Sequence, residues 1–270
     1  MKKYALPAVR LLAPTCLLFI FSCTKSGNRH LQQEAAKLCA IRQFSFGVGI
    51  DRDTITFSYD WLGRPVSSTR KFVGSGSPKY LFRYDDRGRL LDFIGAYDNG
   101  AAEFWTRYTY SEDNRTVWDS TYTLASEYTS WPPRPYFGDL ITAIKQYDRE
   151  GRVIQITTPI VPIVLPDTII TEGTQNYTYD AKGNLNGYTY DDKINYHRTN
   201  KVWMFIDDQY SVNNPFPIDA YDIYELPVKF NFHINPNPFP IYNPILFGLT
   251  YPDAVIEYDC GLPKGPVPAE

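Results

Sequence analysis

The sequence predicts a mostly β protein: an antiparallel meander of repeated hairpins that forms an open curved sheet or a partial barrel. Three observations lead to this fold class. Aromatic residues make up 16% of the chain, and 22 residues are Tyr, a composition that suits paired strands. The 21 Pro and 17 Gly can separate many short strands by turns. A short Tyr-Asp pattern also recurs along the chain.

The recurring pattern is Tyr-Asp-x-x-Gly, followed by a basic or amide residue and preceded in most copies by a second aromatic residue. Four full copies end at Gly63, Gly88, Gly151 and Gly183. A weaker copy carries Ser111 and Asn114 in place of Asp and Gly. A shortened copy near the end of the chain runs from Tyr258 and Asp259 to Gly261.

Each copy has a local reason to close a hairpin. Asp at the first turn position accepts a hydrogen bond from the backbone two residues on, and Gly at the fourth takes a positive φ without strain. A type I turn followed by a left-handed residue closes many hairpins, and Asn114 tolerates the left-handed conformation. Residues 97–100 predict a further tight turn. We therefore expect a positive φ at each repeat glycine, with antiparallel strands on both sides.

This pattern resembles the YD-repeat, also called the RHS-repeat, over roughly residues 39–190 and 255–263. The chain looks most like the short repeat-bearing lipoproteins of unknown function in diderm bacteria. Large YD-repeat proteins coil their strands into a hollow shell around a toxin or a processed C-terminus. The copies in this chain are too few to close such a shell. The resemblance therefore implies an open, curved sheet and little about activity.

The first 23 residues have the pattern of a secretory signal. Lys2, Lys3 and Arg10 are followed by an apolar run at 11–21, which is too short to cross a bilayer because a spanning helix needs about 20 residues. Residues 20–23 resemble the bacterial lipobox. That resemblance implies diacylglycerol on the sulfur of Cys23, cleavage before Cys23 and acylation of the new amine. The alternative is an ordinary signal peptide with an incidental cysteine.

The resemblance to the lipobox also implies a location in the cell. The membrane partner would be engaged through the lipid on Cys23. No acidic residue follows Cys23 directly, so retention in the inner membrane is not signalled. We expect the bacterial outer membrane and leave its face open.

Composition divides the chain into five segments. We expect a signal peptide at 1–22, a tether at 23–37, and the repeat hairpins at 38–190. An irregular Pro-rich insert follows at 191–250, in which residues 201–208 form a short helix or a buried strand. A final strand and tail occupy 251–270. The repeat is expected to be absent from the insert.

Charge and motifs exclude several classes of function. The chain has 27 basic and 30 acidic residues and no basic block, which argues against nucleic acid as a partner. It has three His, at 30, 197 and 233, without the spacing of a zinc site, and it has no phosphate-binding or nucleotide-binding loop. We therefore expect no cofactor, no metal and no catalytic residues: the protein is not an enzyme.

Several acidic and basic residues could have either a structural or a functional role. The acidic pairs at 85–86, 191–192 and 207–208 could serve glycoside hydrolysis or calcium binding. Neighbouring strand residues point to opposite faces, however, so a structural role is favoured. Arg64, Arg89, Arg115 and Arg152 follow the turns and could bind an anion. Ion pairs with the interleaved Asp residues are favoured instead.

Aromatic residues remain as candidates for binding. Of five Trp, Trp61 lies inside a hairpin turn and Trp131 is flanked by Pro, so these two are the candidates for exposed stacking platforms. The leading hypothesis is an envelope lipoprotein that binds or scaffolds a glycan or a protein partner. One alternative is a carrier of an apolar ligand, such as a lipid, on the curved aromatic sheet. Another is a hydrolase that uses residues of 191–244.

Two further cysteines are left once Cys16 is assigned to the signal peptide and Cys23 to the lipid anchor. Cys39 lies at the beginning of the first expected strand, at 38–46, and Cys260 lies in the last repeat turn. A sheet that curls would bring its first and last strands together, and export would favour oxidation. A bridge could stabilise the fold by up to ~5 kcal/mol. An open sheet would instead keep Cys39 and Cys260 apart. A Cα–Cα distance above about 7 Å would exclude the bridge.

Overall fold

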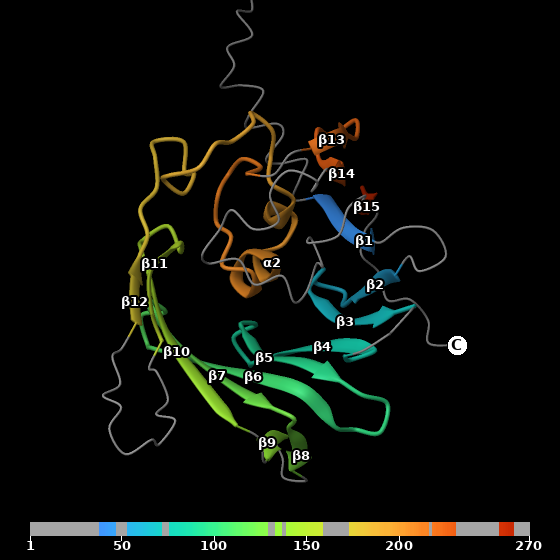
Figure 1. Ribbon diagram of the computed structural model, residues 1–270, viewed down its shortest axis with the longest axis vertical. Helices are drawn as coiled ribbons and strands as arrows, with labels where there is room; N and C mark the ends of the chain where they lie inside the picture. The colour runs from blue at the N-terminus through green and yellow to red at the C-terminus, as the bar shows by residue number, and fades with distance from the viewer. Residues whose placement is uncertain are drawn as a thin grey trace, which may run out of the picture.

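The computed structural model describes residues 38–46, 53–71, 76–128, 133–136, 139–158, 173–215, 218–230 and 254–261. Thirteen of the strands form one antiparallel sheet, in the order β12-β11-β10-β7-β6-β5-β4-β3-β2-β1-β15-β14-β13. The sheet curves around a central segment that contains the helix α2 (Figure 1). The predicted fold class, a mostly β meander in an open curved sheet, is confirmed.

Consecutive strands pair as hairpins through most of the sheet. They are β2 (Asp53–Tyr59) with β3 (Pro65–Arg70), β4 (Lys79–Tyr84) with β5 (Leu90–Ala96), β6 (Ala102–Tyr110) with β7 (Thr116–Thr123), and β10 (Leu140–Tyr147) with β11 (Val153–Thr158), followed by β12 (Gly173–Asn176). Between β7 and β10 the short strands β8 (Ser126–Tyr128) and β9 (Arg134–Tyr136) form a separate two-stranded sheet. The antiparallel meander thus follows directly from the sequence order of the hairpins.

The repeat glycines have the predicted backbone conformation. The φ angles of Gly63, Gly88, Gly151 and Gly183 are 74°, 75°, 76° and 84°, and Asn114 in the weaker copy has φ 57°. The first three glycines separate the paired strands β2–β3, β4–β5 and β10–β11. Gly183 is flanked only by an isolated antiparallel bridge between Tyr179 and Leu185. The turn chemistry therefore closes hairpins as expected, and the last of them is very short.

The first and last described strands of the sheet are neighbours. β1 (Cys39–Phe46) pairs on one side with β2 and on the other with β15 (Val255–Cys260). Cys39 lies opposite Cys260, with a Cα–Cα distance of 4.0 Å, and the two sulfur atoms form a disulfide. This distance is shorter than the Cα–Cα distance of about 7 Å above which a bridge would be excluded. The chain returns to its own beginning, although the edge strands β12 and β13 (Ile218–Tyr221) are not paired with each other.

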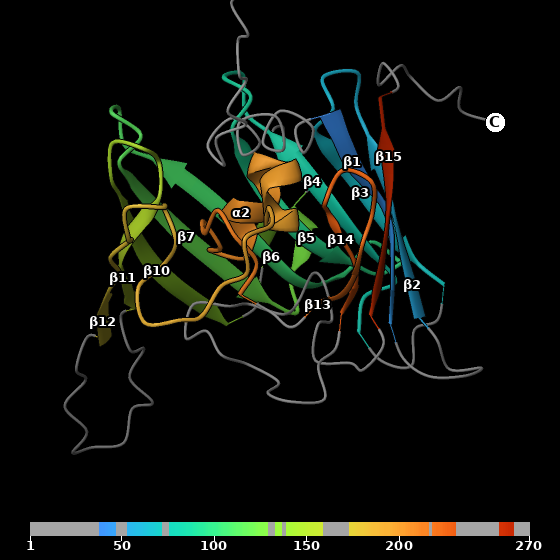
Figure 2. The same ribbon diagram turned by 90° about the horizontal axis from the view of Figure 1, so that it is seen from above.

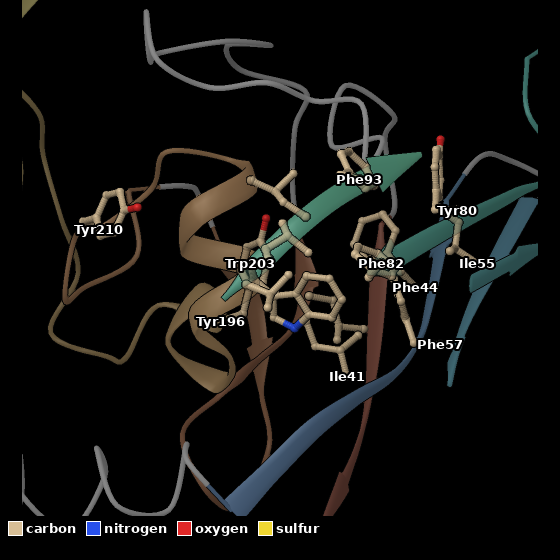
Figure 3. Packing of buried hydrophobic residues seen from close by; sticks show 14 of the residues in the cluster. Ile41, Phe44, Ile55, Phe57, Tyr80, Phe82, Phe93, Tyr196, Trp203 and Tyr210 are labelled. Atoms are coloured by element: carbon tan, nitrogen blue, oxygen red, sulfur yellow. The ribbon is translucent and has the colours of Figure 1, made fainter. Parts of the chain in front are cut away.

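The concave side of the sheet is filled by residues 177–215, which we call the plug. It contains the 3-10 helix η2 (Tyr196–Thr199) and the helix α2 (Lys201–Ile206). Trp203 of α2 is fully buried, and its ring centroid lies 5.1 Å from that of Phe57 and 5.7 Å from that of Phe82 (Figure 3). Phe205 packs in the same way on Tyr108, at 4.8 Å. One aromatic core therefore joins the plug to the sheet.

The helix α2 begins and ends at polar residues. Asn200, at its N-cap, accepts a hydrogen bond from the backbone N–H of Val202 at 3.0 Å, a common way to satisfy a helix start. After Ile206 the chain turns at Asp207, and Asp208 has φ 51°. Of the two alternatives for 201–208, a helix or a buried strand, the structure has the helix.

The insert at 191–250 is less irregular than predicted. Its residues 218–230 form a hairpin of β13 and β14 (Pro227–Phe230) that extends the main sheet. Asp222 accepts hydrogen bonds from the backbone N–H groups of Tyr224 and Leu226, as in the repeat turns, and Glu225 takes the left-handed position with φ 62°. The expectation that the repeat is absent from the insert was wrong. Glu225 stands where the full repeat turns have glycine, so the sequence pattern did not identify this turn.

Candidate functional site

The aspartate of each full repeat turn organises its own hairpin. One carboxylate oxygen of Asp60 accepts hydrogen bonds from the backbone N–H groups of Leu62, at 3.0 Å, and Arg64, at 2.8 Å. The other binds the Arg64 guanidinium, with Nε at 2.7 Å. Asp85 binds Arg89 in the same way. Burial opposes ionisation of Asp85, but its hydrogen bonds from Arg89 outweigh burial and hold its pKa below the ordinary value.

The arginine of one repeat also stacks on the tyrosine of the next. Arg64 lies over the ring of Tyr84 at 4.4 Å, and Arg89 lies over that of Tyr110 at 4.3 Å. Each of these tyrosines donates its hydroxyl hydrogen back to the preceding hairpin, as Tyr84 does to the carbonyl of Pro65 at 2.7 Å. Arg64 and Arg89 therefore form ion pairs with Asp residues, as expected, and also cation–π contacts, which the sequence did not predict.

A buried cation joins the plug to the sheet. The ammonium group of Lys145, on the inner face of β10, lies 2.7 Å from Asp208 of the plug and 3.6 Å from Asp119 of β7. Burial raises the pKa of Asp208 to about 6, although the Lys145 ammonium opposes this shift. Burial alone would lower the pKa of Lys145, but the two carboxylates raise it. The cluster keeps its cation and anchors the plug, because an unpaired buried charge is costly.

A second buried pair lies inside the plug. The Nε2 of His197 is 2.8 Å from a carboxylate oxygen of Asp207, and its Nδ1 is 2.9 Å from the side-chain oxygen of Asn195. His197 and Asp207 are fully buried. Burial lowers the pKa of His197 to about 3 and raises that of Asp207 well above its ordinary value, because it disfavours the charged form of each group. A general base must reach a substrate, and this pair is closed off from solvent.

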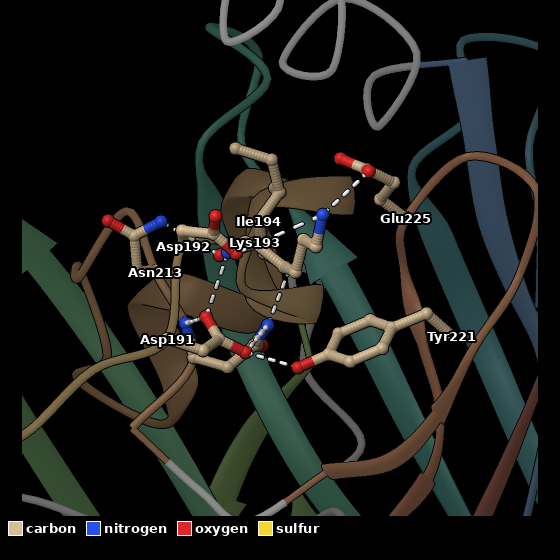
Figure 4. A network of polar contacts seen from close by, with 8 residues as sticks. Asp191, Asp192, Lys193, Ile194, Asn213, Tyr221 and Glu225 are labelled. Carbon is tan, nitrogen blue, oxygen red and sulfur yellow. Dashed lines mark hydrogen bonds and ion pairs between the residues drawn. The ribbon is translucent and has the colours of Figure 1, made fainter. Parts of the chain in front are cut away.

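The two carboxylates of the acidic pair at 191–192 have different surroundings. Asp191 accepts hydrogen bonds from the backbone of Lys193, at 2.9 Å, and from the hydroxyl of Tyr221 on β13 (Figure 4). Asp192 is exposed, whereas Lys193 reaches Glu225 at 2.6 Å. Burial, followed by the nearby Asp191 carboxylate, raises the pKa of Tyr221. These contacts tie the plug to the β13–β14 hairpin and leave no pair of carboxylates that face each other across a site here.

A groove lies beside the same hairpin. It has a volume of about 740 Å³ and is lined by the turn at 221–224 together with residues of β14, β15 and β1. An ion pair between Arg42 and Glu257 contributes to its wall. The groove is open to solvent and mixes tyrosines with charged groups, so by itself it favours no particular ligand.

The outer face of four neighbouring strands, β7, β10, β11 and β12, carries no charged side chain, and the first charged neighbour on that face is Arg107 of β6, opposite Ser120. Side chains alternate along a strand, and because Val117 lies in the core, Trp118 points outward. Trp118 is 42% exposed and lies opposite Thr109 of β6 and Ile144 of β10. The same row continues through Thr157 and Thr174, whose hydroxyl oxygens are 3.2 Å apart.

We call this surface the neutral face. It consists of the outward side chains of β7, β10, β11 and β12: Thr116, Trp118, Ser120, Tyr122, Leu140, Thr142, Ile144, Gln146, Gln155, Thr157, Thr174 and Asn176. Hydroxyl and amide groups surround an exposed indole, and none of these twelve side chains is charged. Such groups both donate and accept hydrogen bonds.

The predicted site residues have different fates. Trp61 is 71% exposed in its turn, which confirms the expectation of an exposed indole. Cys23 and Trp131 lie outside the described residues, as do His30 and His233. Trp118 was missed as a surface residue, because the alternation of Val117 and Trp118 along β7 does not by itself show which of the two faces is covered. The structure brings together Cys39 and Cys260, but not Trp61 and Trp118, which lie on different hairpins.

Comparison of the sequence with known protein families and with curated proteins gave no match. Within the described residues, no group of three or more His, Cys, Asp or Glu is placed to hold a metal ion. The described helices include none with the length and apolar character needed to cross a membrane. The chemistry of the surface must therefore carry the functional argument.

Proposed function

We propose that this chain is a lipid-anchored, non-enzymatic protein of the bacterial outer membrane. It binds a neutral glycan through the neutral face. The observation that carries the proposal is the combination of a filled concave side with an uncharged area on the outer side of β7, β10, β11 and β12. The plug occupies the concave side, and Trp118 stands exposed among hydroxyl and amide groups on the convex side. Binding from outside needs no rearrangement of the core.

The chemistry of the neutral face supports a glycan. Sugar hydroxyls need partners that donate and accept, and Gln155, Thr157 and Asn176 supply both kinds of group. An indole offers a flat apolar surface with a polar edge, on which a pyranose ring can stack. The face also lacks the charged residues that a strongly acidic or basic partner would select. A protein partner on the same face is the alternative.

The filled interior weighs against a carrier of apolar ligands. Trp203, Phe205 and Tyr196 already cover the aromatic rings of the sheet. A lipid would have to displace the plug and its buried contact between Lys145 and Asp208. Two observations disfavour the hydrolase alternative. His197 and Asp207 are buried, and Asp191 is bound to Tyr221 whereas Asp192 is exposed, so the last two do not face a common site.

The test is binding of the protein to an array of neutral and acidic glycans, followed by the affinity of each variant for any glycan retained. Trp118→Ala should weaken binding about tenfold, the effect of losing a central aromatic contact. Trp61→Ala is the matched control, because Trp61 is exposed on another hairpin and should leave the affinity unchanged.

Other outcomes would replace the proposal. Binding that is insensitive to Trp118→Ala would remove the neutral face from the site. Displacement of a fluorescent fatty acid from the interior would favour the carrier, and turnover of glycoside or ester substrates would favour the hydrolase. Mass spectrometry of the mature N-terminus tests the anchor separately, because an unmodified N-terminus away from Cys23 would contradict lipidation.

A further inference from the structure

The central two residues of the repeat turns differ along one end of the sheet. The Asp-x-x-Gly geometry leaves these two positions exposed and places no demand on their side chains, because the turn is held by Asp and by the residue with positive φ. Three turns carry charged residues there: Asp86 and Arg87, Glu112 and Asp113, and Arg149 and Glu150. Of these, Asp113, in the weaker copy that has Ser111 in place of Asp, also accepts hydrogen bonds within its turn. The residue types at these positions therefore reflect what each turn faces, and not what the turn needs in order to form.

Two other turns carry apolar residues at the same positions. Trp61 and Leu62 are 71% and 55% exposed in the β2–β3 turn. Ile223 and Tyr224 are 89% and 39% exposed in the β13–β14 turn. Large apolar side chains at the tip of a turn gain nothing for folding, and clusters of them mark interaction surfaces.

These two turns flank the start of β1. Antiparallel pairing places Cys39 at the end of the sheet that carries the repeat turns, and only β1 and β15 separate the β2–β3 turn from the β13–β14 turn. Figure 2 shows the turns of the β2–β3, β4–β5 and β6–β7 hairpins at the same end of the sheet as the end of β15. Leu38, which directly precedes β1, is itself 64% exposed and accepts a hydrogen bond from Gly261.

The exposed residues therefore gather where the chain from Cys23 enters the sheet. Neighbouring strands are about 4.8 Å apart, so the two turns lie within roughly 20 Å of each other. Residues 23–37 precede Leu38, and 15 residues reach at most about 50 Å even when fully extended. A lipid on Cys23 would hold this end of the sheet within about 50 Å of a bilayer, and the apolar side chains give a reason for this end to face it.

We propose that Leu38, Trp61, Leu62, Ile223 and Tyr224, which we call the apolar rim, rest in the surface of the lipid bilayer to which Cys23 is attached. This inference rests on the proposed lipid anchor. Trp and Tyr suit the interface because each has an apolar body and a polar group that stays hydrated. The anchor and the apolar rim together supply two membrane contacts, and the sheet stands with its strands directed away from the bilayer. The neutral face remains accessible to a glycan.

The test uses the full acylated protein in vesicles of phosphatidylethanolamine and phosphatidylglycerol in which part of the lipid is brominated on its acyl chains. Bromine quenches tryptophan fluorescence only at close range. The wild type should lose a component of its emission that Trp61→Phe lacks, whereas Trp118→Phe should retain the same loss as the wild type. Phe is a mild replacement at an exposed position, so folding is preserved.

A matched pair of turn variants tests the rim without removing the reporter. Ile223→Asp with Tyr224→Arg gives the β13–β14 turn the residues of the β4–β5 turn, and the quenching of Trp61 should fall at least about twofold because apolar burial is lost. Asp86→Ser with Arg87→Ser changes a turn outside the apolar rim and should leave the quenching unchanged.

The outcomes separate the two proposals. If the protein sediments with the vesicles but the quenching is the same in the wild type and Trp61→Phe, the rim proposal is overturned and the anchor stands. If the wild-type protein does not sediment with the vesicles and its N-terminus carries no lipid, the anchor fails and the rim proposal falls with it. Loss of Trp61 quenching on adding a soluble glycan would reassign the rim to glycan binding.

Discussion

The repeat hairpins and the plug reach the same aromatic core by opposite routes. In a hairpin, contacts between residues a few positions apart decide the structure: Asp60 holds Arg64, and Gly63 takes the left-handed conformation. In the plug, the contacts that matter span the chain. Trp203 packs on Phe57, and Lys145 reaches Asp208. The plug has little regular structure beyond η2 and the short α2.

The difference shows how the sheet is completed. Repeat hairpins place aromatic residues on the concave face, where they would meet water if nothing covered them. The plug covers them with Trp203, Phe205 and Tyr196. A short irregular segment can do this because its position is set by packing on a sheet that local chemistry already shapes. The hairpins should therefore tolerate loss of one turn better than the fold tolerates loss of one plug ring.

The largest expected effect is that of Trp203→Ala. Trp203 is fully buried between Phe57 and Phe82, so its removal should lower the free energy of unfolding by about 3–5 kcal/mol. Urea unfolding followed by far-UV circular dichroism measures the change. Trp61→Ala, at an exposed turn, should change it by less than about 0.5 kcal/mol. Equal effects at both positions would contradict the comparison.

Removal of the buried cation should have an effect that depends on pH. Lys145→Met leaves Asp208 and Asp119 facing each other, at a cost of about 3–5 kcal/mol at pH 8. Asp208 already has a pKa of about 6, above its ordinary value, and loss of the ammonium raises that pKa further. A carboxyl with a raised folded-state pKa contributes stability at low pH that is lost as the pH rises through that pKa. The deficit should therefore be smaller at pH 5 than at pH 8.

Unfolding of the wild type and Lys145→Met at both pH values measures this deficit. His197, whose pKa is lowered to about 3, gives the opposite slope as the pH falls below its unfolded value. It is present in both proteins, so the difference between them cancels its contribution. A deficit that grows toward low pH would show that Lys145 is not paired with ionised carboxylates.

The disulfide joins the repeat region to the end of the described chain, and its loss should have an intermediate effect. Replacing Cys39 and Cys260 together by Ala avoids free thiols and should destabilise the fold by about 2–4 kcal/mol. The wild type measured in a reductant provides the control and should approach the double variant. An unchanged midpoint of urea unfolding would mean that the pairing of β1 with β15 holds the chain ends without the bridge.

The smallest expected effect is at a single turn. Gly151 has φ 76° and open space around it, so Gly151→Ala strains only the backbone and should cost about 1 kcal/mol. Asn114→Gly at the matching position of the weaker copy should gain a few tenths of a kcal/mol or leave stability unchanged. Thermal unfolding of both variants checks the prediction, and a cost at Gly151 as large as that of Trp203→Ala would reverse the ranking.

Much of the sheet was predictable because each turn is specified within five residues. The exception is the copy at 221–228, where Glu225 occupies the left-handed position and Leu226 replaces the basic residue. Its Asp222 still makes the two turn hydrogen bonds. A search for Tyr-Asp with proline five residues after the aspartate would have matched Asp222 and Pro227 to Asp60 and Pro65.

The surface sites were only partly predictable. Trp61 could be placed at an exposed turn because its neighbours in the sequence define that turn. Trp118 required knowledge of which face of β7 is covered, and this depends on the plug. No local sequence pattern predicts the groove beside β13 or the buried pair of Lys145 and Asp208, because each brings together residues that are far apart in the sequence.

The sequence by itself determined the hairpins, their antiparallel order and the glycine conformations, because these depend on short-range hydrogen bonds and backbone sterics. The tertiary structure alone decided three other features: Cys39 meets Cys260, residues 177–215 fill the concave side, and the edge strands β12 and β13 remain unpaired with each other. Each depends on how far the sheet curves. Curvature is a sum over many strand pairs and over the volume of the side chains packed inside, which no single segment of the sequence specifies.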